Sequence, residues 1–411
     1  MQTMADVYLG DDAVLVGRAR FVLRRGQVTT SFTYDEAYLA RPDAFAIDPA
    51  LPLAGRVGFA AGLPGAFSDS APDRWGRRLI RRASARVPDE VDYLLGVYDR
   101  TRQGALRFRI PGETAFCTED AEVPPVVRLP RLLAACRALL TEGDAGDEVK
   151  CLLDAGSSTL GGARPKATVD DGGDFYIAKF PAPGDDHDVM AWEKTALDLA
   201  ASCGLTVPDS RLVRIGGEAV LLTRRFDRDG GGRLPHLSAM SLLGARDGEA
   251  RDYTEVAEAL ASFVGDPERD LEELFGRVAF SIAVNNTDDH LRNHGFLRAG
   301  GRWRLSPAFD VNPNPDDCAQ RATAVFGECG GGQSRALAEA APYFGLDAGR
   351  HAALSAGFWE QLGAGVRLPV ATAARRPRSP GSVGCSMCGR GSSRGRLGCR
   401  TDAVGLRSAH C

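Results

Sequence analysis

A nine-residue polar segment constrains the fold of this chain more than any other feature. Residues 285–293 read NNTDDHLRN and follow the run Leu271–Val284, which has helical character. A strand-like segment, Gly295–Leu297, comes soon after. Polar residues this dense beside a helical core cost stability unless they serve a site. We therefore expect a functional loop between a helix and a strand, although an Asx-rich helix cap and turn is the simpler alternative.

The spacing within this segment predicts a particular chemistry. Asp288 and Asn293 form an Asp-x-x-x-x-Asn motif, the spacing found in kinase catalytic loops. There the aspartate accepts the proton of the substrate hydroxyl and the asparagine holds a metal ion. Asp310 follows Asp288 by 22 residues, beyond a predicted hairpin, where a second magnesium-binding carboxylate would lie. Carboxylate and amide oxygens are ligands that suit the hard Mg²⁺ ion.

The distribution of lysine indicates a second part of the site. The chain has only four lysines, and all of them lie between residues 150 and 194. Lys179 stands in the apolar, strand-like run Phe175–Phe180, where a buried ammonium would need a partner. Glu193, in the predicted helix Ala191–Ser202, could be that partner, and this lysine–glutamate pair positions phosphates in kinases. Chance clustering and an exposed edge lysine are the alternatives.

A glycine- and serine-rich turn, residues 156–162, precedes the strand-like run Lys166–Val169. Small residues allow backbone N–H groups to approach a phosphate closely. The turn lacks the Walker A spacing, and an ordinary turn between strands is the alternative. The order of the motifs is more specific than any one of them: glycine turn, strand lysine, helix glutamate, Asp-x-x-x-x-Asn and a late aspartate predict phosphoryl transfer.

Together these motifs resemble the HipA family, the serine/threonine-kinase toxins of bacterial toxin–antitoxin pairs. The matching stretches are residues 63–76 (LPGAFSDSAPDRWG), 161–166 (GGARPK), 178–181 (AKFP), 225–228 (RFDR), 288–293 (DDHLRN) and 309–311 (FDV). The resemblance implies an α+β, two-lobed, protein-kinase-like fold with a mixed α/β N-terminal region and a mostly helical C-terminal lobe. The expected divisions are an N-terminal α/β module (1–110), a linker and helix (111–150), a kinase-like domain (151–354) and an atypical tail (355–411).

The resemblance also implies roles for individual residues. Asp288 would be the catalytic base, with Lys179 and Glu193 as further catalytic residues, and Asn293 and Asp310 would hold Mg²⁺. The region Thr223–Phe226 would lie against the adenine of ATP. Autophosphorylation would occur at Ser157, Ser158 or Thr159. The implied nucleotide contacts are Gly161, Gly162, Ala163, Arg164, Pro165, Lys166, Lys179, Arg224, Arg225, Phe226, Asp289, His290 and Asp310.

Partners and location follow from the resemblance and from charge. The family implies a small, HipB-like DNA-binding antitoxin and a protein substrate such as an aminoacyl-tRNA synthetase. Residues 371–411 carry a formal charge of +7, so the rest of the chain carries −11, and we expect no direct DNA binding. No apolar run of membrane-spanning length and no signal peptide is evident, which predicts a cytoplasmic protein without a membrane contact.

Two other functions stay open at this stage. One is a kinase of a small molecule or lipid on the same scaffold, although the acidic body disfavours a lipid surface. The other is a catalytically degenerate relative that acts only with its antitoxin. The Arg-, Gly-, Ser- and Cys-rich tail predicts disorder or a shifted reading frame. Its cysteines, Cys385, Cys388, Cys399 and Cys411, could in principle form a zinc knuckle, but no core surrounds them.

Overall fold

The computed structural model describes residues 2–118, 122–141, 146–156, 164–316, 318–351, 354 and 360. They belong to one compact unit, Met1–Arg375. The predictions for the tail and for most of the glycine-rich turn therefore lie outside the described residues. Within the turn, this concerns Ser157, Ser158, Thr159, Gly161, Gly162 and Ala163.

The N-terminal region is a five-stranded antiparallel sheet in the order β4-β3-β2-β1-β5. Its strands are β1 (Gln2–Leu9), β2 (Val14–Arg24), β3 (Gln27–Tyr34), β4 (Gly58–Ala61) and β5 (Leu106–Arg109). The apolar runs at 13–16 and 20–23 of the sequence predict two strands with a turn between them, but both runs belong to the single strand β2, so that prediction is wrong. Gly17 pairs with Tyr34, and a Cβ there would lie 2.3 Å from the Thr33 carbonyl oxygen. The glycine thus permits close strand approach.

Four short helices accompany this sheet: α1 (Glu36–Leu39), α2 (Gly65–Asp69), α3 (Arg74–Ala83) and α4 (Glu90–Leu95). The Ser- and Asp-rich stretch 68–73 of the sequence predicts a helix start. Helix α3 indeed begins at the N-cap Asp73, whose side chain accepts a hydrogen bond from Gly76 N. Its apolar side chains do not join the N-terminal core. Trp75 and Leu79 pack instead with the second sheet and its helices.

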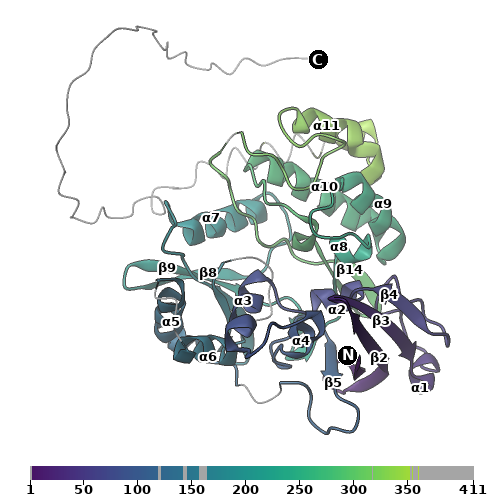
Figure 1. Ribbon diagram of the computed structural model, residues 1–411. Helices are drawn as coiled ribbons and strands as arrows, with labels where there is room; N and C mark the ends of the chain where they lie inside the picture. Colours follow the sequence, from purple (N-terminus) through teal and green to yellow (C-terminus); the bar gives the residue numbers. More distant parts are fainter. Residues whose placement is uncertain are drawn as a thin grey trace, which may run out of the picture. The chain divides into compact units, whose positions relative to one another are not determined.

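The second sheet has four antiparallel strands in the order β6-β7-β9-β8. They are β6 (Lys166–Asp171), β7 (Asp174–Lys179), β8 (Ser210–Ile215) and β9 (Glu218–Arg224), and helix α7 (Val189–Ser202) follows β7. Helices α5 (Leu129–Thr141) and α6 (Gly146–Asp154) pack with strands β6, β7 and β9 in one apolar cluster (Figure 1). Lys179, the last residue of β7, is also buried, but its side chain lies on the opposite face of the strand from Tyr176 and Ala178.

The third part is mainly helical. It contains α8 (Ala239–Leu242), α9 (Tyr253–Phe263), α10 (Pro267–Ala283), α11 (Gln333–Ala340) and the 3₁₀ turns η2 (Leu291–Asn293) and η3 (Ala341–Phe344). A small sheet in the order β12-β13-β14 joins it, formed by His236–Ser238, Gly295–Ala299 and Arg302–Leu305. The core packs Tyr253, Leu260, Leu274 and Phe296 together. The predicted mixed α+β architecture with a helical C-terminal lobe is confirmed.

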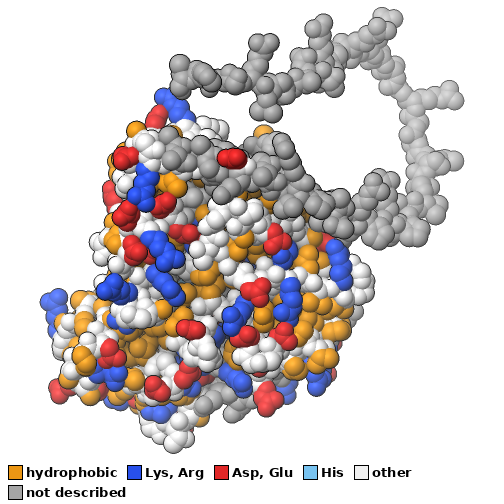
Figure 2. Space-filling view, turned by 180° about the vertical axis from the view of Figure 1, so that it is seen from behind, with side chains coloured by type: hydrophobic (Ala, Val, Ile, Leu, Met, Phe, Trp, Pro, Cys, Tyr) orange, Lys and Arg blue, Asp and Glu red, His pale blue; other side chains and the backbone are white. Residues whose placement is uncertain are grey.

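Two minor strands, β10 (Arg228–Asp229) and β11 (Gly232–Arg233), and the 3₁₀ turn η1 (Val126–Arg128) complete the described elements. In the part of the chain that the structure describes, no helix combines the length and the apolar character needed to cross a bilayer. Figure 2 shows acidic and basic side chains interspersed over one face of the described part.

Candidate functional site

Lys179 lies at the centre of the candidate site. Its Nζ donates to Glu193 Oε1 on α7 at 2.5 Å and to Asp310 Oδ1 at 2.6 Å. Burial alone would lower the pKa of Lys179, but the charges of Asp310 and Glu193 raise it above its ordinary value. The ammonium therefore stays charged, and three groups separated by up to 131 positions in sequence meet at one point.

Asp310 reaches Lys179 from an unusual backbone conformation. Its φ is +58°, in the left-handed region that non-glycine residues rarely adopt. Burial opposes ionisation of this carboxyl, but Lys179 and then Lys166 lower its pKa to about 2. Asn312 Nδ2 donates to Asp310 Oδ1 at 3.2 Å, and the buried Asn312 Oδ1 has no hydrogen-bond partner among the described residues. An oxygen-seeking cation would find two suitable donors here.

The loop that carries Asp288 begins with a tight helix ending. Asn285 has φ +52°, and Asn286 N donates to Ser281 O at 2.9 Å while Asn285 N donates to Ile282 O at 3.1 Å. These two bonds form a Schellman motif, with asparagine at the position that glycine usually takes. The turn ends α10 at Ala283 and directs residues 286–293 back across the helix end.

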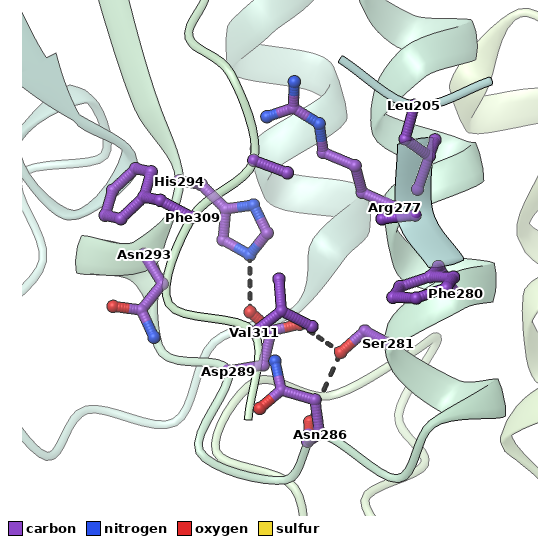
Figure 3. Close-up of a pocket in the computed structure, with 12 residues that line it drawn as sticks. Leu205, Arg277, Phe280, Ser281, Asn286, Asp289, Asn293, His294, Phe309 and Val311 are labelled. Atoms are coloured by element: carbon purple, nitrogen blue, oxygen red, sulfur yellow. Dashed lines mark hydrogen bonds and ion pairs between the residues drawn. The ribbon is translucent and has the colours of Figure 1, made fainter. Parts of the chain in front are cut away.

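Adjacent aspartates in this loop have opposite environments. Asp288 is exposed, whereas Asp289 is 4% exposed. Asp289 accepts hydrogen bonds from Ser281 Oγ at 2.6 Å and from His294 Nε2, which lies 2.9 Å away (Figure 3). It also accepts a hydrogen bond from Tyr253 Oη. Burial opposes ionisation, yet the contact with His294 and these donors lower the pKa of Asp289. The buried aspartate anchors the loop, which leaves the exposed one available for chemistry.

Asn293 is held to the same loop. Its Nδ2 donates to the Asp288 carbonyl oxygen at 3.0 Å, so its amide oxygen is the atom that a metal ion would use. Asn293 and Asp289 also line a cavity of about 20 Å³ with Phe280, Phe309 and Val311 (Figure 3). A space of this size holds about one water molecule and is far too small for a nucleotide.

Three predicted nucleotide contacts, Arg164, Pro165 and Lys166, lie where the glycine-rich turn meets the second sheet. The Arg164 guanidinium contacts both oxygens of Asp185 at 2.8 Å. Lys166 Nζ donates to Asp73 Oδ2 at 2.8 Å, with both side chains nearly fully buried. Pro165, between them, is buried, and its carbonyl oxygen accepts a hydrogen bond from Phe180 N at 2.9 Å. This segment is firmly held at the described end of the turn.

The predicted adenine-binding region is tied to the N-terminal part of the chain. The buried Arg225 guanidinium donates to Asp227 at 2.6 Å, to Thr101 O at 2.6 Å and to Arg102 O at 3.2 Å. Asp227 Oδ2 also accepts from Gly104 N at 2.8 Å. The Arg225 guanidinium therefore donates its hydrogen bonds to acceptors inside the protein. The roles of Arg225 and Asp289 in nucleotide binding stay predictions.

The neighbours of Arg225 are placed differently. Arg224 is exposed and pairs with Asp174 at 2.7 Å. The centroids of the Phe226 and Phe309 rings lie 5.2 Å apart. Because Phe309 precedes Asp310, this contact connects the predicted adenine-binding region to the candidate metal ligand Asp310. His290 is half-buried, and its Nδ1 has no hydrogen-bond partner among the described residues.

Sequence reasoning missed three residues that the structure adds to the site region. Asp73 and Lys166 are 93 positions apart, and no local pattern joins them. Arg321 Nη1 donates to Ser281 Oγ at 2.7 Å and to Asn286 O at 2.9 Å, again over long separations. Asn312 could have been found, because it follows Asp310 in an Asp-x-Asn arrangement of oxygen donors.

The donor set at this site is mixed. Among the residues that the structure describes, no three His, Cys, Asp or Glu side chains converge as a metal-ligand group. One carboxylate supplemented by amide oxygens is still compatible with Mg²⁺, which keeps several waters and binds through few protein ligands.

Comparisons with known proteins assign both main parts of the chain to one family. Residues 5–109 match the family model described as the HipA N-terminal domain. Residues 158–356 match the model described as the HipA-like C-terminal domain. A chain of the Shewanella oneidensis MR-1 complex of HipA, HipB and operator DNA superposes with a TM-score of 0.65 and 16% identity, covering 88% of this chain and 89% of that chain.

Two further similarities are more partial. A Haemophilus influenzae protein described as "Putative kinase" is 27% identical over 161 residues, 34% of this chain and 46% of that protein. The match thus spans about half the length of this relative. The Helicobacter pylori proinflammatory kinase CtkA has a TM-score of 0.36 at 17% identity, covering 50% of this chain and 88% of that chain.

Proposed function

Because the chain belongs to the HipA family, we propose that it is an ATP- and Mg²⁺-dependent serine/threonine protein kinase. The observation that carries this proposal is the contact of Lys179 with both Glu193 and Asp310 at hydrogen-bonding distance. A strand lysine held by a helix glutamate beside a metal-binding aspartate is the arrangement that kinases use to position phosphates.

The residues around Lys179 have complementary roles in this proposal. Glu193 orients the Lys179 ammonium, which contacts the phosphates of ATP and compensates their charge. Asp310 and Asn293, with Asn312 as a further candidate ligand, hold Mg²⁺. The metal would neutralise charge that develops on the phosphates. Each of these groups is fixed before the substrate binds, which favours catalysis by positioning.

Asp288 acts on the other substrate. The hydroxyl oxygen of a serine or threonine attacks the γ-phosphorus, the bond from that phosphorus to the β–γ bridging oxygen breaks, and the hydroxyl proton passes to the Asp288 carboxylate. The exposure of Asp288 supports this role, because a protein substrate must reach it. Autophosphorylation at Ser157, Ser158 or Thr159 is part of the proposal.

Family membership also supports a partner. The similar Shewanella oneidensis structure contains HipA together with HipB and operator DNA. We accordingly propose a HipB-like antitoxin as the partner of this chain, through which it would associate with DNA. A protein of the translation machinery, such as an aminoacyl-tRNA synthetase, is the proposed substrate class.

Radiolabelled phosphate transfer from ATP tests the proposal directly. We expect the native chain with Mg²⁺ to label a peptide that contains residues 157–159. Asp288→Asn should reduce transfer by about 10²- to 10⁴-fold while ATP still binds. Asp310→Ala should abolish transfer and weaken the dependence of ATP binding on Mg²⁺.

The control is Asp43→Asn, which removes an exposed carboxylate that pairs with Arg41 and should leave transfer unchanged. Transfer that survives Asp288→Asn would contradict the assignment of the base. A folded native chain that binds no ATP would contradict the kinase proposal itself.

A further inference from the structure

Lys166 is a buried cation that the N-terminal region neutralises. It is the first residue of β6, directly after the turn proposed to bind nucleotide. Its Nζ lies 2.8 Å from Asp73 Oδ2, with side-chain exposures of 2% and 6%. Trp75 Nε1 also donates to the Lys166 carbonyl oxygen at 3.2 Å. The start of helix α3 thus holds both the side chain and the backbone of Lys166.

Lys166 and Lys179 are direct cross-strand neighbours. They pair in the antiparallel register of β6 and β7, which places their side chains on the same face. Residues opposite each other in such a pair have Cβ atoms about 4.5–5.5 Å apart, and like charges there repel. Two ammonium groups can share this buried face because each of them contacts at least one carboxylate.

The carboxylates come from three different parts of the chain. Glu193 and Asp310 contact Lys179, and Asp73 contacts Lys166. Three carboxylates against two ammonium groups give this cluster a formal charge of −1. Lys166 acts across the cluster, because it stands directly opposite Lys179 in the strand register and Lys179 contacts Asp310. Asp73 therefore belongs electrostatically to the candidate site.

We propose that Asp73 is a positioning residue of the nucleotide site: its carboxylate holds Lys166 in the charge cluster and weakens the attraction of the site for phosphates. This inference rests on the proposed function as an ATP-dependent enzyme. Asp73 acts on phosphates in two ways, by repelling their negative charge and by occupying a lysine that would otherwise attract them. The N-terminal region thereby restrains nucleotide binding in the kinase-like part.

Two charge-removing variants distinguish this role from a structural ion pair. Asp73→Asn keeps a side chain that caps helices well, so helix α3 retains its first hydrogen bond. It makes the cluster more positive, and we expect ATP to bind on the order of tenfold more tightly. Lys166→Gln leaves Asp73 unpaired, makes the cluster more negative and should weaken ATP binding by a similar factor.

The experiment is calorimetric titration of the full chain with MgATP and, in parallel, with adenosine. Adenosine lacks phosphates, so its affinity should be the same in all variants. The double variant Asp73→Asn/Lys166→Gln has the formal charge of the native cluster and should bind ATP about as well as the native chain. If Asp73→Asn alone does not fold, comparison of the double variant with Lys166→Gln still isolates the effect of Asp73.

The inference would be overturned if both single variants changed the affinity for ATP in the same direction. The loss of a purely structural ion pair would damage the site whichever partner is removed. Parallel changes for ATP and adenosine would overturn it too. If the native chain binds ATP but the two single variants do not change its affinity in opposite directions, only this inference is contradicted. A folded native chain that binds no ATP contradicts the proposed function as well.

Discussion

Neighbouring carboxylates in the loop after α10 show how strongly environment decides what a residue can do. Asp288 and Asp289 are chemically identical, but one is exposed and the other accepts hydrogen bonds from Ser281, Tyr253 and His294. The sequence motif distinguished them only by its spacing. The structure supplies the physical reason: a fully engaged carboxylate fixes the loop so that its neighbour can stay free.

Replacing Asp289 should therefore affect stability with a defined dependence on pH. Asp289→Asn removes a buried charge from its partners and should lower the free energy of unfolding by about 3 kcal/mol at pH 7. The native carboxyl has a pKa below its unfolded value, so its stabilisation is complete above about pH 4 and is lost as the pH falls through the folded pKa.

Urea unfolding at pH 7, 5 and 3.5 measures this difference. The gap between the native chain and Asp289→Asn should be constant from pH 7 to 5 and should narrow at pH 3.5. A difference in the free energy of unfolding that grows as the pH falls would contradict a lowered pKa of Asp289 in the folded state. Asp288→Asn is the matched control, because an exposed carboxylate should change stability by less than about 0.5 kcal/mol.

At the scale of elements, local patterns predicted most of what the structure contains. Apolar residues at helical spacing in the sequence predict helices over 131–140 and 191–202, and the structure has α5 (Leu129–Thr141) and α7 (Val189–Ser202) there. The pairing of Lys179 with Glu193 was also predicted. The prediction of a turn within β2 was wrong, because the close approach of Gly17 to a neighbouring strand leaves no local signal in the sequence.

Contacts between distant elements were beyond such patterns. The Asp73–Lys166 pair and the contacts of Arg321 join residues that are far apart in the sequence and come together only in the folded chain. These contacts depend on which charged groups are buried together, and the spacing of residues in the sequence does not indicate this. The catalytic, metal-binding and nucleotide-binding roles stay predictions, since geometry alone does not measure them.

The contact between α2 and α8 provides a test at this scale. A Cβ on Gly65 would lie 2.6 Å from Ser241 Cβ and 2.9 Å from Ser241 Cα. Since a backbone atom cannot move aside cheaply, Gly65→Ala should separate the two helices and destabilise the chain by about 1–3 kcal/mol. Chemical denaturation measures this loss.

The matched control for that test is Gly146→Ala in α6, where a Cβ would meet nothing within 4 Å. Alanine has the higher helix propensity, so this variant should be neutral or more stable by up to about 1 kcal/mol. Equal effects of the two substitutions would show that α2 and α8 are not closely packed.

For the whole molecule, apolar cores are shared between regions of the chain that lie far apart in sequence. Leu237 of the helical part lies in the N-terminal core, while Trp75 and Leu79 of the N-terminal part lie in the core of the second sheet. Arg225, which follows β9 of the second sheet, also links this sheet to Thr101 and Arg102 of the N-terminal part. The boundaries expected at 110 and 150 thus cross shared cores, although the division into domains stays a prediction.

Calorimetric unfolding should consequently give one transition for the full chain, with the calorimetric and van 't Hoff enthalpies equal. Trp75→Ala should lower the midpoint of that transition without dividing it, because its cost of about 3–5 kcal/mol falls on a core that both regions share. Two resolved transitions would mean that the regions unfold independently.

The position of α3 also has a consequence for how the chain is made. Helix α3 ends at Ala83, but the sheet that covers Trp75 and Leu79 is complete only when β9 ends at Arg224. At bacterial elongation rates of about 5–20 residues per second, the ribosome needs on the order of ten seconds to add the intervening residues. During that interval helix α3 has α5 and α6 as native partners but lacks the complete sheet, so part of its apolar face stays exposed on the nascent chain and could be bound by a chaperone.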